Sequence, residues 1–126
     1  MRRPLRNVPE GDRGSVTAEL AVGLPAVALV LVMVLVVASA AVAQTRCADG
    51  ARTGARAAAL GEDDAAVAAS ARRVAGDGAR VVVTRDDGWV TVDVEAAVGF
   101  GGRFGPMRVR ADAVGRAEPR LPAGSP

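Results

Sequence analysis

The chain has 126 residues, of which 50% are hydrophobic and 2% aromatic, and its 16 basic and 14 acidic residues leave a net charge of +2. It has no histidine, every basic residue is an arginine, and Cys47 is the single cysteine. These absences exclude imidazole catalysis, lysine-based Schiff-base or P-loop chemistry, an internal disulfide and a thiolate zinc cluster. We therefore expect a protein that is not an enzyme and that uses no cofactor, no metal ion and no small-molecule substrate.

The first predicted element is a helix that crosses a membrane. No charged residue occurs from Leu20 to Thr45, and this run of about 26 residues exceeds the ~20 that a helix needs to span a bilayer. A globular protein would bury such a helix only in a large core, which the rest of this chain is too short and too poor in aromatic residues to provide. The arginines before the run favour a cytoplasmic N-terminus and an external C-terminal region; they are Arg2, Arg3, Arg6 and Arg13. Membrane lipid is therefore a predicted partner, and the cytoplasmic membrane the predicted location.

Three processing outcomes are compatible with this N-terminal region. The residues Ala41-Val42-Ala43 before Gln44 fit a signal peptidase site, and cleavage there would release a small secreted domain. Signal peptides, however, have apolar regions of about 7–15 residues, shorter than this run. A second outcome is an uncleaved, single-span envelope protein. The third outcome is a cut on the other side of the apolar run.

The residues before the apolar run are Arg13-Gly14-Ser15-Val16-Thr17-Ala18-Glu19. They resemble a type IV prepilin cleavage site, in which a basic leader ends in glycine and the fifth residue of the mature chain is glutamate. With Ala21, Pro25 and the Ala/Arg-rich stretch from Asp49 to Gly61, the region is similar to the start of TadE-like minor pilins or pseudopilins. These proteins belong to the tight-adherence (Flp type IV pilus) machinery. Leu20 departs from the pattern, because an aromatic residue often follows the glutamate in related pilins.

This resemblance implies a structural subunit of a pilus-like secretion and assembly system that serves cell adhesion. It implies cleavage between Gly14 and Ser15 by a prepilin peptidase, which would leave the apolar helix on the mature protein in the membrane or in an extracellular pilus. Other pilin or TadE-like subunits and the tight-adherence assembly machinery are the further implied partners.

The resemblance also implies an assembly role for Glu19. The carboxylate of one subunit would pair with the α-amine that cleavage frees on Ser15 of a neighbour, since opposite charges relieve each other's desolvation cost in a medium of low dielectric. The alternative is that Glu19 is an acid in the first helical turn, where it suits the helix dipole and is solvated by lipid headgroups. Pro25 is expected to kink the helix, either as a static bend or as a place that yields during packing.

Residues 46–117 are predicted to form a small extracytoplasmic α+β region. The helix continues from Arg46 to Leu60 and ends at Gly61, and Gly50 and Gly54 weaken the prediction that it is unbroken. Its alanines fall on one face, for close helix packing or simply for helix propensity; they are Ala48, Ala51, Ala55, Ala58 and Ala59. A second helix starts at the acids 62–64 and runs to about residue 75. Its inward residues are predicted to be Val67, Ala71 and Val74.

An antiparallel sheet of about three strands is predicted next. The strands 80–85 and 89–95 flank Asp87-Gly88, a favoured two-residue hairpin turn, which pairs Val83 with Val92 and Val81 with Val94. The third strand is predicted at 107–114, with its arginines paired to acids of the second strand; they are Arg108 and Arg110, and Asp93 and Glu95. The acids among these arginines argue against nucleic acid as a partner.

Between the last two strands lies a glycine-rich loop. Its phenylalanines, Phe100 and Phe104, are expected to cover the small core. The tail 118–126 is rich in proline, glycine and serine and is expected to be disordered. The predicted fold is thus α+β: a basic leader (1–14), a transmembrane helix (15–45) that continues into an exposed helix, then a second helix and the sheet.

Overall fold

The computed structural model describes residues 11–100 and 104–118. The chain divides into two compact units, residues 1–35 and 36–126, and helix α1 (Gly11–Ala59) contributes to both. The expectations for the leader before Gly11, for the side chains of Phe100 and Phe104, and for the tail after Glu118 lie outside the described residues.

In the first unit, the described chain is the N-terminal part of α1. This helix begins at Gly11, four residues before the predicted start at Ser15, and it continues as an α-helix through Pro25. Its large apolar side chains are exposed; Val22, for example, is 76% exposed. Among the described residues, α1 is the one helix that is long and apolar enough to cross a membrane, and none of its most apolar stretch is buried by protein. The predicted transmembrane helix therefore has the form that a lipid environment requires.

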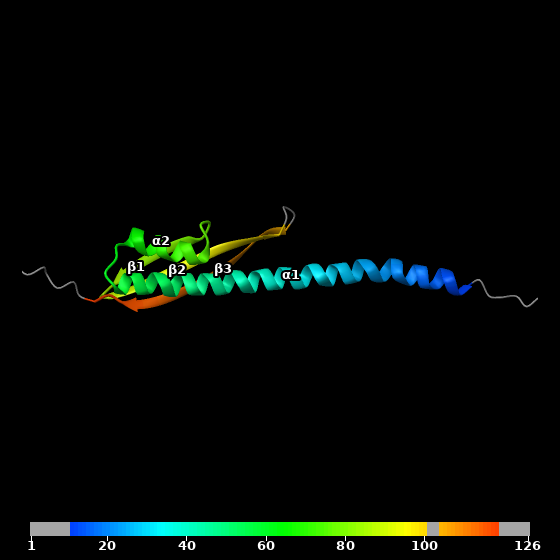
Figure 1. The fold of residues 1–126 in the computed structure, drawn as a ribbon, viewed down its shortest axis with the longest axis horizontal. Helices are drawn as coiled ribbons and strands as arrows, with labels where there is room; N and C mark the ends of the chain where they lie inside the picture. The colour runs from blue at the N-terminus through cyan, green and yellow to red at the C-terminus, as the bar shows by residue number, and fades with distance from the viewer. Residues whose placement is uncertain (1–10, 101–103, 119–126) are drawn as a thin grey trace, which may run out of the picture. The chain divides into compact units, whose positions relative to one another are not determined.

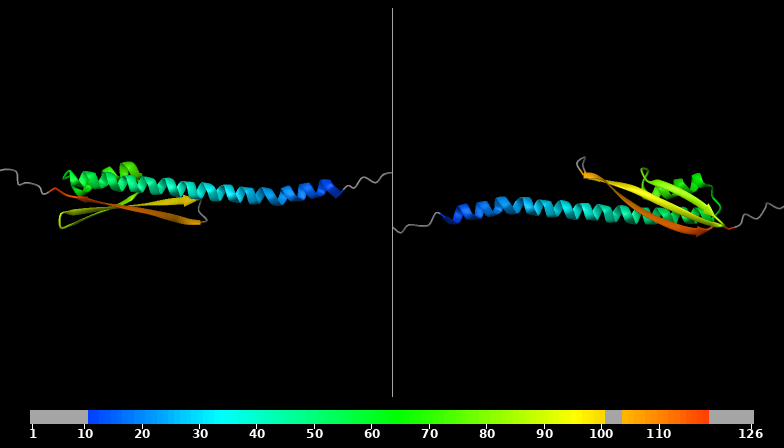
Figure 2. Two further views of the ribbon diagram at one scale, coloured as in Figure 1. Left: turned by 90° about the horizontal axis from the view of Figure 1, so that it is seen from below. Right: turned by 180° about the vertical axis from the view of Figure 1, so that it is seen from behind.

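In the second unit, the remainder of α1 is followed by α2 (Asp64–Ala75) and three strands: β1 (Arg80–Asp86), β2 (Trp89–Phe100) and β3 (Phe104–Arg116). The strands form an antiparallel sheet in the order β1-β2-β3. The C-terminal part of α1 and α2 lie side by side and cover one face of this sheet (Figure 1 and Figure 2). The predicted α+β class and element order are confirmed.

The end of α1 and the start of α2 are set by local hydrogen bonds. After α1, the amides of Gly61 and Glu62 donate to the carbonyls of Ala58 and Ala57 at 3.0 and 3.2 Å, the pattern of a Schellman cap. The Asp63 carboxylate then accepts a hydrogen bond from the Ala66 amide at 2.8 Å and caps α2. The two helices are therefore separated by a short, fully capped connection, as the acid-rich sequence predicted.

The hairpin has the predicted register. Asp87 and Gly88 both adopt positive φ (44° and 80°), as a type I′ turn requires, and Val83 lies opposite Val92. Because side chains alternate along a strand, this register directs one set of valines towards the helices. Val90, Val92 and Val94 are at most 1% exposed.

The core beneath the helices consists of small side chains. Its largest fully buried members are Val67, Val90, Val92, Val94 and Cys47. The prediction that Val74 faces inward is wrong, because this side chain is 39% exposed. In the last turn of α2, the side chain nearest α1 is Ala75, which leaves Val74 on the solvent side.

Candidate processing and assembly site

The residues of the predicted cleavage site lie in the first turns of α1. Gly14 and Ser15 are exposed, and a Cβ added at Gly14 would meet no atom within 4 Å. The Thr17 hydroxyl donates to the Arg13 carbonyl at 3.1 Å and so bridges the Gly14–Ser15 peptide bond. A protease that binds an extended chain would have to open this turn first. A glycine in the turn lowers the cost of opening, because glycine destabilises a helix by about 1 kcal/mol relative to alanine.

Glu19 lies one helical turn beyond Ser15, so both residues are on the same face of α1. Its side chain is exposed and forms no hydrogen bond or ion pair with any part of the chain that the structure describes. Glu19 is also the last charged residue before the apolar run. Among the residues that the structure describes, no positive group neutralises this carboxylate.

Gly14, Ser15, Glu19 and Pro25 all belong to the described part of the first unit. Their relative positions follow from the geometry of α1 alone. The kink at Pro25 stays a prediction.

A small-residue face on the second part of α1 packs against α2 and the sheet. Its buried members are Cys47, Gly50, Ala51, Gly54, Ala55 and Ala58. A Cβ at Gly50 would lie 2.9 Å from the Ala71 carbonyl oxygen, and one at Gly54 would lie 2.9 Å from Cγ1 of Val92. Gly50 and Gly54 therefore do not interrupt the helix; they allow it to approach its neighbours closely. Their four-residue spacing along the alanine face was the signal of this role in the sequence.

Cys47 belongs to this buried face. It is 0% exposed, and its Sγ lies 4.0 Å from the Val109 carbonyl oxygen of β3. Burial raises the pKa of the thiol above its usual value. A lone thiol can be buried in the core or available for an intermolecular disulfide, and in this structure Cys47 is free and buried.

The sheet face opposite the helices carries ion pairs. Arg110 contacts Asp93 at 2.6 Å and Arg108 contacts Glu95 at 3.0 Å, as predicted. The hydrogen bond to Asp93 is the main cause that raises the pKa of Arg110. Both arginines are about two-thirds exposed, so these pairs contribute little to stability. They keep the outer face of the sheet polar.

Comparison with known proteins supports the resemblance read from the N-terminal residues. A family model described as TadE-like protein matches residues 14–56, about a third of the chain. The matched segment starts at the predicted cleavage site and ends within the small-residue face of α1. No curated protein and no solved structure shows a significant match to the chain.

Proposed function

We propose that this chain, of which residues 14–56 match a family model of TadE-like proteins, serves as a minor pilin or pseudopilin of a tight-adherence system. The observation that carries the proposal is Glu19, an exposed carboxylate without a partner among the described residues, placed at the start of the apolar helix. A group so placed costs free energy in lipid unless a positive charge meets it. A neighbouring subunit would supply that charge.

In this proposal, a prepilin peptidase cleaves the chain between Gly14 and Ser15. The exposure of both residues and the open space around Gly14 support access by a protease. Cleavage would remove the arginine-rich leader and leave a positively charged α-amine on Ser15. The new N-terminus would then lie one turn from Glu19 on the same helix face.

The α-amine of one subunit would next pair with Glu19 of its neighbour. In a medium of low dielectric the two opposite charges attract strongly, and each removes the other's desolvation cost. Because the partners sit at fixed positions on α1, the pair would set the axial register of adjacent helices. The apolar surface of Leu20–Thr45 would supply the remaining contacts, first with lipid and then with other subunits.

The mature N-terminus tests the processing step. We expect Ser15 as the first residue of the protein isolated from cells that contain the peptidase. Gln44 at this position would instead indicate secretion after signal peptidase cleavage, and Met1 would indicate an uncleaved anchor. Either result would contradict the proposal.

A substitution at the cleavage site gives a second, independent test. Gly14→Leu should reduce processing at least about tenfold, because a large side chain next to the scissile bond interferes with binding to the protease. Gly11→Leu is the matched control: Gly11 is also a helical glycine with open space around it, and this variant should be processed normally. Equal processing of the two variants would exclude cleavage after Gly14.

The assembly role of Glu19 is tested with Glu19→Gln, which keeps the side-chain shape and removes the charge. We expect normal membrane insertion and normal cleavage, but at least about tenfold lower incorporation into the pilus or its assembly platform. Incorporation is measured by co-purification with the assembled machinery. Wild-type incorporation of this variant would rule out the charge pairing.

A further inference from the structure

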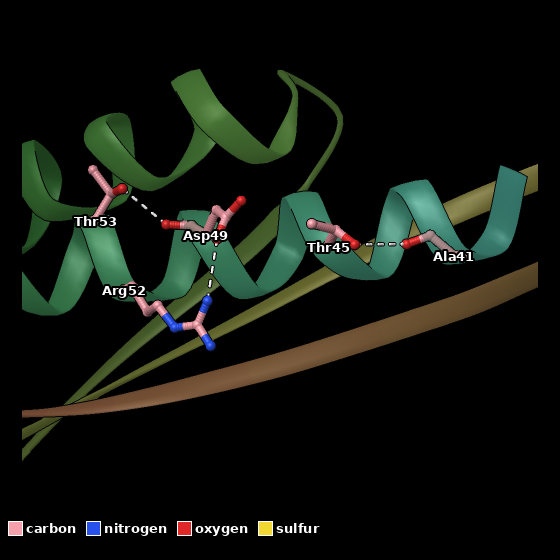
Figure 3. Close-up of polar contacts among 5 residues, drawn as sticks. All are labelled: Ala41, Thr45, Asp49, Arg52 and Thr53. Carbon is pink, nitrogen blue, oxygen red and sulfur yellow. Dashed lines mark hydrogen bonds and ion pairs between the residues drawn. The ribbon is translucent and has the colours of Figure 1, made fainter. Parts of the chain in front are cut away.

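In the second unit, α1 has an exposed face directly opposite its small-residue face. We call it the arginine face and define it as Arg46, Asp49, Arg52, Thr53 and Arg56. Figure 3 shows part of it, with Asp49 and Arg52 in contact at 3.2 Å. The hydroxyls of Thr45 and Thr53 donate back to carbonyls of α1 itself at 3.0 and 2.8 Å. The charged groups are therefore what this face offers to a partner.

The positive charge on the arginine face is not balanced within the described part of the unit. Three arginines face one acid, Asp49, and the contact with Arg52 is between highly exposed groups, so it holds that arginine only weakly. The side chains of Arg46 and Arg56 form no hydrogen bond or ion pair with the described residues. All members of the arginine face are exposed, so neither α2 nor the sheet covers it.

The opposite charge accumulates just beyond the end of α1. A surface hollow of about 380 Å³ is lined there by a set that we call the acidic end: Gly61, Glu62, Asp63, Asp64, Arg85, Ala117 and Glu118. Arg85 neutralises Asp64 at 2.7 Å, and Asp63 caps α2. The carboxylates of Glu62 and Glu118 form no hydrogen bond or ion pair with the rest of the described chain, which leaves the hollow negatively charged.

Within one molecule, the two surfaces lie at different heights along α1. Arg56 and Arg52 lie three and seven residues before Ala59, the last residue of α1, which is about 4.5 and 10.5 Å along the helix axis, and Glu62 follows that helix end. A second copy with a parallel α1, shifted axially by one such distance, would bring its arginine face beside the acidic end of the first. We propose that the arginine face of α1 is a docking surface for the acidic end of a second copy of this chain.

Such a contact joins two different surfaces, so each copy keeps one of each free for the next copy. Head-to-tail contacts of this kind extend into a filament when the rotation between copies does not close a ring. The inference rests on the proposed function, because it supposes that α1 helices assemble in parallel. It adds an interface outside the apolar run, formed by Arg52 and Arg56 on one copy and Glu62 and Glu118 on the other.

Site-directed cross-linking of the full-length chain in membranes tests the contact. In a Cys47→Ala background, one tagged copy carries Thr53→Cys on the arginine face, and a second carries Leu60→Cys next to the acidic end. Leu60 is 77% exposed, and neither substitution removes a charge. We expect this pair to cross-link at least about fivefold more than Thr53→Cys with Thr84→Cys, an exposed site on the opposite face of the sheet. Equal yields would overturn the proposal.

Charge reversal shows whether the complementary charges carry the contact. Arg56→Glu in the Thr53→Cys copy should reduce the cross-link about fivefold, and Glu62→Arg in the Leu60→Cys copy should restore it. High salt should weaken the wild-type contact, since it screens charges between exposed groups. A cross-link yield that does not change with salt or with the charge reversals would contradict the assignment of the two surfaces. So would a failure of the double reversal to restore the yield.

The same samples separate this inference from the proposed function. The mature N-terminus is determined for each cross-linked and uncross-linked fraction. Ser15 as first residue without the selective cross-link would refute only the docking surface. A first residue other than Ser15 would refute the processing proposal, while the cross-link would still report whether the copies meet through these surfaces.

Discussion

At the scale of single residues, two glycines decide how closely α1 approaches its neighbours. Gly50→Ala would place a methyl group 2.9 Å from the Ala71 carbonyl oxygen and 3.0 Å from Cβ of Ala75. A backbone carbonyl cannot move out of the way by changing a side-chain rotamer, so α1 and α2 would have to separate. We expect this to lower the free energy of unfolding by about 1–3 kcal/mol. Urea unfolding of the purified chain in detergent measures it. The control, Gly78→Ala, adds the same methyl group in open space and should leave the midpoint unchanged.

The thiol of Cys47 should report the integrity of the same face. Because the side chain is 0% exposed and burial raises its pKa, the reactive thiolate is both scarce and inaccessible in the folded protein. We expect alkylation more than about 100-fold slower than that of Thr53→Cys, which lies on the exposed side of the same helix. The raised pKa also means that the rate for Cys47 keeps increasing at a pH where the exposed thiol is already ionised. Equal rates at neutral pH would show that this face is open.

At the scale of the elements, the sheet presents two unlike faces, one packed against the helices and one that bears the ion pairs between β2 and β3. The contributions of these faces to stability should differ accordingly. Val92→Ala removes atoms from a fully buried position beneath α1 and should cost about 1–3 kcal/mol. Arg110→Ala breaks the 2.6 Å contact with Asp93, but both groups are in contact with water, and the unfolding midpoint should barely change. A midpoint shift for Arg110→Ala as large as that for Val92→Ala would mean that the outer face of the sheet is covered in the assembled protein.

At the scale of the whole molecule, the charge asymmetry around the apolar run predicts the orientation in the membrane. We expect the arginine-rich leader inside and residues 46–117 outside. In the Cys47→Ala background, Thr84→Cys should react in intact cells with a maleimide that reaches the external side of the cytoplasmic membrane but cannot cross it. A cysteine placed in the leader at Asn7 should react only after the membrane is opened. The reverse pattern would contradict the orientation.

Much of the fold was predictable because its signals are local. The absence of charge from Leu20 to Thr45 defines an apolar helix without reference to any other segment. Asp87-Gly88 determines the hairpin turn, and a two-residue loop leaves one register, which pairs Val83 with Val92. The spacing from Gly14 to Glu19 identified the candidate site in the same way, through residues on one helix.

What the sequence alone determined is therefore the type, order and pairing of the elements, together with the similarity of residues 14–56 to TadE-like proteins. Only the tertiary structure decided that Gly50 and Gly54 are contact points, that Cys47 is buried and that Val74 is exposed. These properties depend on the distance between α1 and segments that lie from 13 residues (Gly54 to Val67) to 62 residues (Cys47 to Val109) further along the chain, and no local propensity contains that distance. The same contacts buried the small-residue face of α1 inside the unit and left its arginine face open to a partner.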